Sequence, residues 1–154
     1  MKYFNASIRN LVYRLRKFDE ILAEALEEII VSLESVIVQL VSEEQLYKQG
    51  INGKGIEIMS YAPYAYSTIK NKKRKGQPTN RVTLRDTGAF HKSFFIVFDE
   101  GGFYITAEDK KLKALEAKYG EAIFRLTNEN LTYLLRNYVR PMLTERLKNK
   151  LLGA

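Results

Sequence analysis

Apolar residues recur every three or four positions through residues 4–41, and no other feature constrains the fold of this chain as strongly. This spacing places side chains on one face of an α-helix. It predicts two helices, or one helix bent near Phe18–Asp19, where Asp19 can cap a new start, over about residues 3–46. The stripe is two residues wide at 29–30, 36–37 and 40–41, which is broader than a coiled-coil seam. We therefore expect cover on more than one side, from the chain's own sheet or from an adjacent subunit.

The length and composition are those of one globular domain. The chain has 154 residues, of which 45% are hydrophobic, which is enough for a core of its own. We predict a single α+β domain over residues 1–154, with helices at 3–46, loops and sheet at 47–107, and helices at 108–152. The long N-terminal helices and a C-terminal helix are expected to pack on a small antiparallel sheet.

The chain lacks the residues that several kinds of functional site require. The chain has no cysteine and one histidine, His91, which excludes a disulfide framework, a thiolate metal site and a zinc site built from several histidines. We expect no cofactor and no metal, and we interpret His91 as a polar surface residue. The apolar stretches are broken by Glu34 and Gln39, and the N-terminus has no signal-peptide core, so we expect no membrane span and a reducing cytoplasm.

Alternating apolar residues predict the sheet. Residues Ser93–Asp99 and Gly102–Ala107 form the clearest hairpin, joined by Glu100-Gly101. The first of these strands is apolar on both faces, which favours cover on both sides. Shorter strands are expected at Ile56–Met59, after a glycine-rich loop at 49–55, and at Arg81–Leu84.

Two further helices are predicted in the last third of the chain. The first ends at Gly120. The second begins at Thr127 or Asn128 and is kinked by Pro141, which removes one backbone hydrogen bond. Its inner face is expected to carry Leu131, Leu134, Leu135, Tyr138, Met142, Leu143, Leu147 and Leu151.

The net charge of +7 is laid out in blocks of one sign. Residues 1–18 carry five basic side chains and no acid, residues 19–44 carry eight acids and no base, and residues 48–92 are basic again. Such blocks favour contact between oppositely charged faces, within the fold or between neighbouring copies.

The strongest basic feature lies in a segment, Tyr61–Asn80, that we expect to be a long irregular loop. Its cations and those that follow are Lys70, Lys72, Lys73, Arg74, Lys75, Arg81 and Arg85. They can neutralise phosphates while Tyr61, Tyr64 and Tyr66 stack on bases. Alternatively, they can contact an acidic face of a neighbouring copy, such as one that displays Glu20, Glu24, Glu27 and Glu28. The second interpretation is favoured over the first because no established nucleic-acid-binding pattern accompanies the cations. The third alternative is a solvated loop without a ligand.

The tetrapeptide Asp86-Thr87-Gly88-Ala89 resembles the active-site motif of aspartic proteases. Those enzymes need two such loops, because two carboxylates about 3 Å apart must share one proton. This chain has one copy of the motif, Arg85 precedes it, and both ends of the chain are predicted to be helical. We therefore interpret Asp86, Thr87 and Gly88 as a structural turn that caps a short helix, and the chain as not an enzyme.

The order of elements between Tyr61 and Asp99 resembles a phage protein family. A tyrosine-rich turn and the run Lys72-Lys73-Arg74-Lys75-Gly76 lead into residues 84–94, Leu-Arg-Asp-Thr-Gly-Ala-Phe-His-Lys-Ser-Phe, and then into an alternating strand. This order is similar to that of the tail-completion, or virion-morphogenesis, proteins of tailed bacteriophages. The long N-terminal helices lie outside the resemblance.

The resemblance implies a structural component of the virion. Such a protein forms part of the neck, the head–tail connector or the tail-completion ring, as one subunit of a homo-oligomeric ring, and has no chemistry of its own. Its expected partners are other neck, portal or tail proteins, with packaged DNA as a further contact and no membrane. It would be assembled in the host cytoplasm and located in the virion. The alternative is a basic nucleic-acid-binding accessory protein of a phage.

Overall fold

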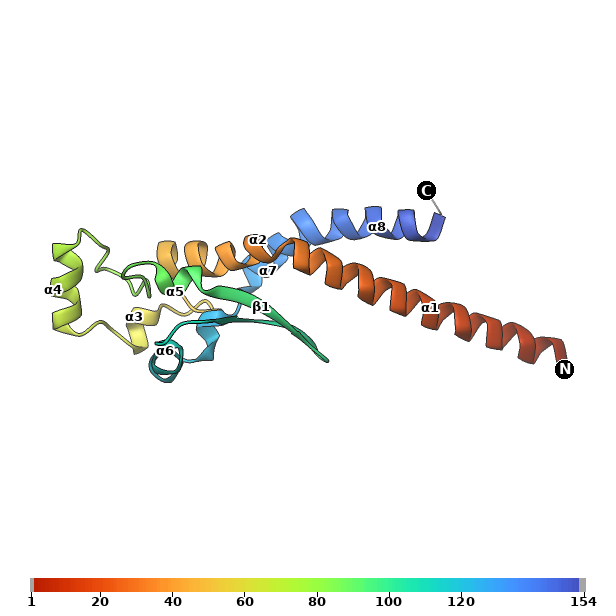
Figure 1. Cartoon of the computed structure of the whole chain (residues 1–154), viewed down its shortest axis with the longest axis horizontal. Coiled ribbons are helices and arrows are strands. Elements are labelled where there is room, and N and C mark those ends of the chain that lie inside the picture. Colours follow the sequence, from red (N-terminus) through yellow and green to blue (C-terminus); the bar gives the residue numbers. More distant parts are fainter. Residues whose placement is uncertain (1, 153–154) are drawn as a thin grey trace. The chain divides into compact units, whose positions relative to one another are not determined.

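The chain is an α+β protein with one long N-terminal helix, a C-terminal helix and a two-stranded antiparallel sheet, which confirms the predicted fold class (Figure 1). The structure is a computed structural model that describes residues 2–152, with side chains for residues 8–150. Phe4 and Leu151, which belong to the predicted apolar stripes, lie outside the described side chains.

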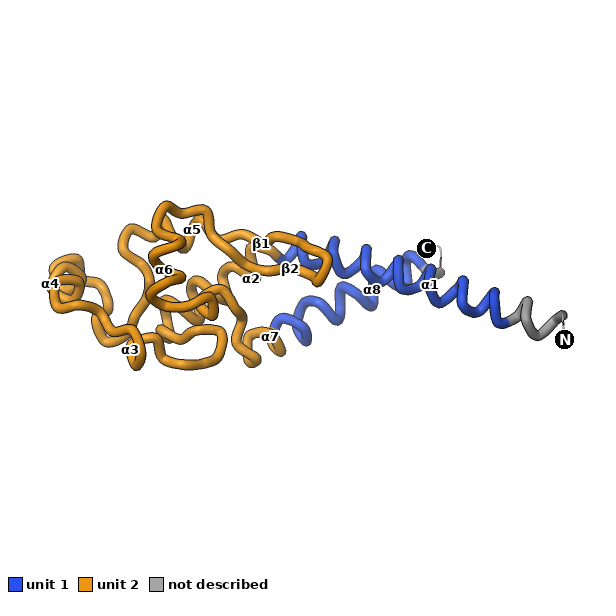
Figure 2. Tube along the Cα trace, turned by 90° about the horizontal axis from the view of Figure 1, so that it is seen from below, with its two compact units in different colours: residues 1–33, 134–154 blue, residues 34–133 orange. Residues whose placement is uncertain are grey.

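The chain forms two compact units (Figure 2). Unit 1 combines residues 1–33 with residues 134–154, and unit 2 consists of residues 34–133. The single-domain organisation stays a prediction.

Unit 1 is built on α1 (Lys2–Ser32), which is one uninterrupted helix. The predicted break or bend at Phe18–Asp19 is wrong, because the apolar residues continue past it at helical spacing and Asp19 remains within the helix. The helix ends at Ser32, and Leu33 forms the turn before the next helix.

The C-terminal helix α8 (Arg140–Leu152) packs antiparallel along the second half of α1. Lys150 Nζ lies 2.8 Å from a Glu24 oxygen, and Arg146 pairs with Glu28, so the two helices run in opposite directions. These pairs occupy two of the four acids that were expected to face a neighbouring copy. Ala25 and the neighbouring Ile29 are fully buried in unit 1.

A π-helical segment, η3 (Leu135–Val139), separates α7 (Asn128–Leu134) from α8. It ends at Val139, two residues before Pro141, which has no N–H to donate to the preceding turn. A π-turn inserts one extra residue and so rotates the apolar stripe. Leu131 and Leu135, which were predicted on the inner face, are exposed, whereas Leu134 and Val139 are buried.

Unit 2 begins with α2 (Glu34–Gln39) and the π-helical η1 (Leu40–Gln49), which Gly50 ends in the left-handed conformation at φ 69°. The fully buried residues Ile37, Val41 and Leu46 form its core side. Within the segment that follows, an antiparallel bridge joins Ile51 to Glu57. The predicted strand at Ile56–Met59 is wrong, because α3 (Ile58–Tyr61) starts within it.

The predicted hairpin is confirmed as β1 (Phe94–Asp99) and β2 (Gly102–Ala107), paired from Phe94 with Ala107 to Asp99 with Gly102. Helix α2 packs on β1, and the Glu34 carboxylate accepts the Ile96 N–H at 2.9 Å, which occupies the outer edge of that strand. We expected both faces of the first strand to be covered, but Phe95 and Phe98 of β1 are exposed, as is Tyr104 of β2.

Two helical segments follow the hairpin. The predicted helix before Gly120 is α6 (Leu112–Tyr119), and a 3-10 turn, η2 (Glu121–Phe124), comes directly after it. Helix α7 then begins where predicted, with the Thr127 hydroxyl accepting the Asn130 N–H at 3.2 Å.

Gln45, which is fully buried, joins η1 to the segment before α7. Its amide nitrogen donates to the Arg125 carbonyl at 2.9 Å, and its amide oxygen accepts the Thr127 N–H and the Asn130 side-chain amide, both at 2.9 Å. These bonds connect residues that are 80 or more positions apart in the sequence.

We expect Gln45→Leu to lower the free energy of unfolding by about 2 kcal/mol, because buried polar groups of residues 125, 127 and 130 lose their partner. Urea denaturation measures the change. Gln49→Leu, at the exposed end of η1, is the matched control and should change stability by less than about 0.5 kcal/mol. Equal effects of the two substitutions would contradict this role for Gln45.

Candidate interaction face on α4

The basic segment is more ordered than the sequence indicated. Within the predicted irregular loop Tyr61–Asn80, residues Tyr66–Arg74 form helix α4, which puts most of the basic run on a helix. A helix gives alternate cations different environments, because each residue is rotated by about 100° from the one before.

Lys72 faces inward and is 6% exposed. Its ammonium group donates to the Arg85 carbonyl at 2.7 Å, to the Gln77 side chain at 3.1 Å and to the Thr83 hydroxyl at 3.4 Å. It also lies 5.1 Å from the centre of the Tyr64 ring. Lys72 therefore holds residues 77–85 against α4 and is not available to a partner.

Arg85 and Arg81 fasten the same segment to η1. Arg85 Nη1 lies 3.1 and 3.2 Å from the two Glu43 carboxylate oxygens, and its guanidinium carbon is 4.6 Å from the centre of the Tyr47 ring. Arg81 donates to the Tyr47 carbonyl at 2.8 Å. Both side chains are thus committed to the fold.

Three of the seven predicted contact residues remain free on one face of α4. Lys70, Lys73 and Arg74 are exposed, and in the described part of the chain none of them has a hydrogen-bond or ion-pair partner. Residue 70 is followed at steps of three and four by 73 and 74, so the three side chains share a face. Tyr66, one turn earlier on this face, is 83% exposed. We call these four residues the α4 face.

The other two predicted tyrosines are structural. The Tyr61 hydroxyl donates to the Tyr119 carbonyl at 2.9 Å, and the Tyr64 hydroxyl accepts the Thr83 N–H at 2.8 Å. Tyr66 is the most exposed of the three and shares a face with Lys70, Lys73 and Arg74.

The turn at Asp86, Thr87 and Gly88 leads into a short helix, α5 (Ala89–Lys92). The Thr87 hydroxyl accepts the Ala89 N–H at 3.3 Å, and Gly88 has φ 88°, which glycine adopts without strain. Asp86 pairs with Lys75, and the hydrogen bond from Lys75 lowers the pKa of its carboxyl group. The predicted strand at Arg81–Leu84 is wrong, since these residues form no strand pairing.

His91 is 5% exposed, so its interpretation as a surface residue is wrong. Neither ring nitrogen has a hydrogen-bond partner among the described residues, and the ring lies 6.0 Å from that of Phe94. Burial lowers the pKa of His91 to about 4, with smaller contributions from Arg85 and Lys72, against the opposing effect of Glu43 and the Thr83 backbone. Burial therefore favours the neutral form of His91, whose ring packs against that of Phe94.

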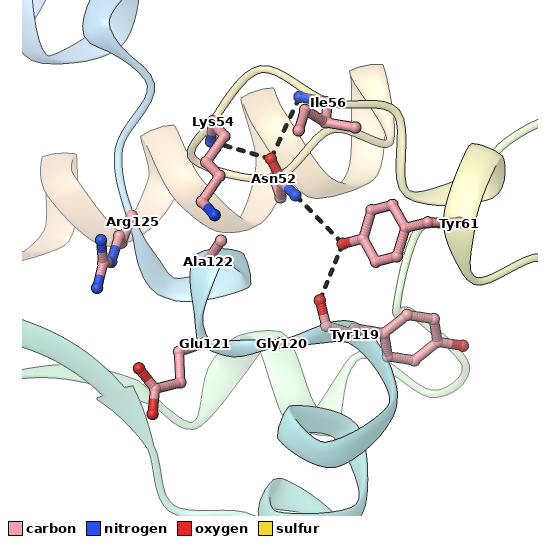
Figure 3. A pocket seen from close by; sticks show the side chains of 9 residues that line it. All are labelled: Asn52, Lys54, Ile56, Tyr61, Tyr119, Gly120, Glu121, Ala122 and Arg125. Atoms are coloured by element: carbon pink, nitrogen blue, oxygen red, sulfur yellow. Dashed lines mark hydrogen bonds between the residues drawn. The ribbon is translucent and has the colours of Figure 1, made fainter.

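Sequence reasoning missed a hollow of about 430 Å³ beside the glycine-rich loop (Figure 3). Asn52 donates to the Tyr61 hydroxyl at 3.2 Å, and the hydroxyl donates to the Tyr119 carbonyl (Figure 3). The Asn52 side-chain oxygen accepts the backbone N–H groups of residues 54 and 56. These polar groups form hydrogen bonds with one another. We therefore interpret them as groups that fix the conformation of the loop, and not as a ligand-binding site. The glycine-rich composition of residues 49–55 was its one sequence signal.

Gly53 shows how closely that loop approaches the segment after η2. Its N–H donates to the Ala122 carbonyl at 2.7 Å, and a Cβ at this position would lie 2.4 Å from both the Cβ and the carbonyl oxygen of Arg125. No larger residue fits there without moving the backbone.

Within residues 2–152, no group of three or more histidine, cysteine, aspartate or glutamate side chains is arranged to hold a metal ion. No helix in the same range combines the length and the apolar character needed to cross a membrane. No protein-family model, curated protein or solved structure matches this chain.

Proposed function

We propose that this chain is a non-enzymatic structural subunit of a tailed-phage virion, located in the neck, the head–tail connector or the tail-completion ring and assembled in the host cytoplasm. The α4 face carries the proposal. It lies inside the segment that resembles tail-completion proteins, and it presents Lys70, Lys73 and Arg74 without internal partners.

The base of the α4 face is rigid, which favours a specific contact over loose attraction. Lys72 anchors the inner side of α4, and Lys75 pairs with Asp86 just beyond its end. Because the helix that carries them is anchored, binding of a partner has to order only the cationic side chains and not the backbone. We therefore assign to this face an acidic surface on a neighbouring neck, portal or tail subunit, where a specific and partly desolvated contact can form.

The surroundings of Asp86 support a structural role. Its carboxylate pairs with Lys75, and its carbonyl accepts the Gln77 amide at 2.6 Å. An aspartic protease needs this carboxylate to face a second one and to share a proton with it.

The alternative function is that of a nucleic-acid-binding accessory protein. Tyr66, exposed beside three cations, favours it, because an aromatic ring can stack on a base while the cations neutralise phosphates. Packaged DNA is the nearest polyanion in a virion neck.

The triple variant Lys70→Ser, Lys73→Ser, Arg74→Ser separates the two functions. We expect the variant to be incorporated into particles at least about tenfold less than the wild type, while binding to free DNA barely changes. The measurement is mass spectrometry of purified particles from cells that supply the variant. The control, Lys110→Ser, Lys111→Ser, Lys113→Ser, removes the same charge from another exposed stretch and should be incorporated normally.

Normal incorporation of the triple variant would overturn the proposed subunit contact. If DNA affinity falls instead, and the slope of log affinity against log salt decreases by up to about three, one for each lost phosphate contact, the alternative holds.

A further inference from the structure

The first half of α1 has an apolar face that no other described residue covers. The exposed fractions are 44% for Ile8, 55% for Leu11, 42% for Val12, 55% for Leu15 and 38% for Phe18. At 100° per residue these five side chains fall within an arc of about 120° around the helix. This arc is wider than the seam that one partner helix covers in a coiled coil.

Helix α8 covers α1 only further along. Its ion pairs with Glu24 and Glu28 fix its position, and Ala25 and Ile29 are buried in this half of α1. A single uncovered helix is marginally stable in water, because its stability comes mainly from packing of its apolar face. Residues 8–18 therefore gain stability from any surface that covers them.

The sign of the charge changes where the uncovered face ends. Residues 1–18 carry five bases and no acid, and the first acid is Asp19. Acids of the second half pair with cations of α8. In contrast, Arg9, Arg14, Arg16 and Lys17 have no hydrogen-bond or ion-pair partner in the described part of the chain. The basic, uncovered half of α1 thus lacks both an apolar and an anionic partner.

The cations are placed on both sides of the apolar arc. Arg14 lies about 100° from the centre of the arc on one side, and Arg16 lies about 100° from it on the other. Long basic side chains in such positions can bury their stems beside an apolar face while the charged group stays in a polar layer.

A hollow of about 560 Å³ lies on this half of α1, with Leu11, Leu15 and Phe18 in its lining. The charged residues that line it are Arg14, Lys17 and Lys150, all of them cations, and Lys150 already pairs with an acid of α1. The occupant that fits this surface is apolar in the middle and anionic at its edges.

A bilayer surface with anionic lipids has both properties. Helices that lie in such a surface carry leucine and phenylalanine on one face and lysine and arginine on the other. Acyl chains form a continuous apolar layer that can cover a wide arc, and phosphate groups lie beside the helix on either side. An acidic helix of another protein also supplies carboxylates, but it covers a narrow seam. The width of the arc therefore favours lipid.

We propose that residues 8–18 of α1 bind along the surface of a membrane that contains anionic phospholipid. This segment is about 16 Å long and lies in the surface without crossing it. The resemblance to tail-completion proteins implies no membrane contact, so the inference goes beyond the proposed function. It rests on α1 alone and uses none of the α4 face, and either can fail without the other.

Flotation of the full chain with vesicles tests the apolar contact. We expect binding to vesicles of equal parts phosphatidylglycerol and phosphatidylcholine, and the variant Leu11→Asn, Leu15→Asn should bind them at least about tenfold more weakly. The matched control is Leu131→Asn, Leu135→Asn. These two leucines are also exposed, at 39% and 46%, so their replacement should leave binding unchanged.

Vesicles of phosphatidylcholine alone test the role of charge. The natural chain should bind them at least about tenfold more weakly than the anionic vesicles, because the cations lose their partners. The variant Arg9→Gln, Arg14→Gln, Arg16→Gln should lose most of this preference. The control is the triple variant of the α4 face, which removes the same number of charges elsewhere and should keep the preference.

Fluorescence shows which face of α1 meets the lipid. The natural chain has no tryptophan, so Leu15→Trp introduces the only one. Its emission should shift to shorter wavelength when anionic vesicles are added, because the ring enters an apolar layer. Tyr13 is 66% exposed on the opposite face of α1, and the emission of Tyr13→Trp should stay as it is in buffer.

Three results would overturn the proposal. The first is a chain that does not float with anionic vesicles at low salt. The second is equal binding by the natural chain and by Leu11→Asn, Leu15→Asn, which reduces the effect to attraction by net charge. The third is an oligomer that forms without lipid and dissociates on Leu11→Asn, Leu15→Asn, which assigns the apolar face to another protein helix.

Discussion

Replacing Lys72 with methionine should lower the free energy of unfolding by about 3 kcal/mol, because the buried Arg85 carbonyl loses a charged hydrogen bond and Tyr64 loses its cation. The adjacent Lys73→Met is the control. Lys73 lies on the exposed face of α4, so its replacement should change stability by less than about 0.5 kcal/mol. Urea denaturation of both variants measures the difference.

The comparison is sharp because the two lysines are neighbours in sequence and differ only in the direction they face. Similar effects on stability would show that residues 77–85 do not depend on the Lys72 ammonium group. In that case, a Lys72→Met variant that is not incorporated into particles would have lost contact with a partner and not stability.

Stability should also fall by about 3 kcal/mol as the pH drops from about 6.5 to 4, on account of His91. Its pKa is about 4 in the folded chain and 6.5 without burial, so the unfolded chain takes up a proton across this range and the folded chain does not. The contribution is complete above pH 6.5 and is lost as the pH falls toward 4. The stabilising contribution of Asp86, whose pKa is lowered, is lost only at still lower pH.

The variant His91→Leu tests this assignment. Leucine has no proton to gain and fills the same apolar site beside Phe94, so the dependence of stability on pH between 6.5 and 4 should largely disappear. Urea denaturation at four or five pH values measures it. A variant with the full pH dependence of the wild type would assign the effect to another group.

The parts of the fold that the sequence predicted well depend on local signals. The hairpin Phe94–Asp99 with Gly102–Ala107 has alternating apolar residues and a two-residue turn, and both act between near neighbours. Thr127 caps α7 through a bond to a residue three positions on. Gly88 marks a backbone conformation that other residues avoid.

The environment of single charged residues was not predictable, because it depends on distant segments. In the sequence Lys72 is one cation in a run of four, and only the return of residues 77–85 over α4 buries it. His91 is buried for a similar reason, since Glu43, Lys72 and Arg85 come to it from other parts of the chain. Three of the seven predicted contact residues therefore remain as a candidate site.

Helix boundaries failed where a local preference competed with packing. Asp19 is a good cap, yet the apolar seam runs through it and α1 continues to Ser32. The π-helical segments at Leu40–Gln49 and Leu135–Val139 shift the apolar stripe by a residue, and no residue type signals such an insertion.

The composition of unit 1 has a consequence for folding during synthesis. Unit 1 joins two segments that flank unit 2 in the sequence, so the ribosome makes α1 before unit 2 and its partner α8 after it. All of unit 2 emerges between them, and its local elements, such as the hairpin, can form as they appear. Until α8 is made, the apolar face of α1 that α8 covers is exposed to solvent. The intervening residues 34–133 must form a closed loop before α1 and α8 can come into contact.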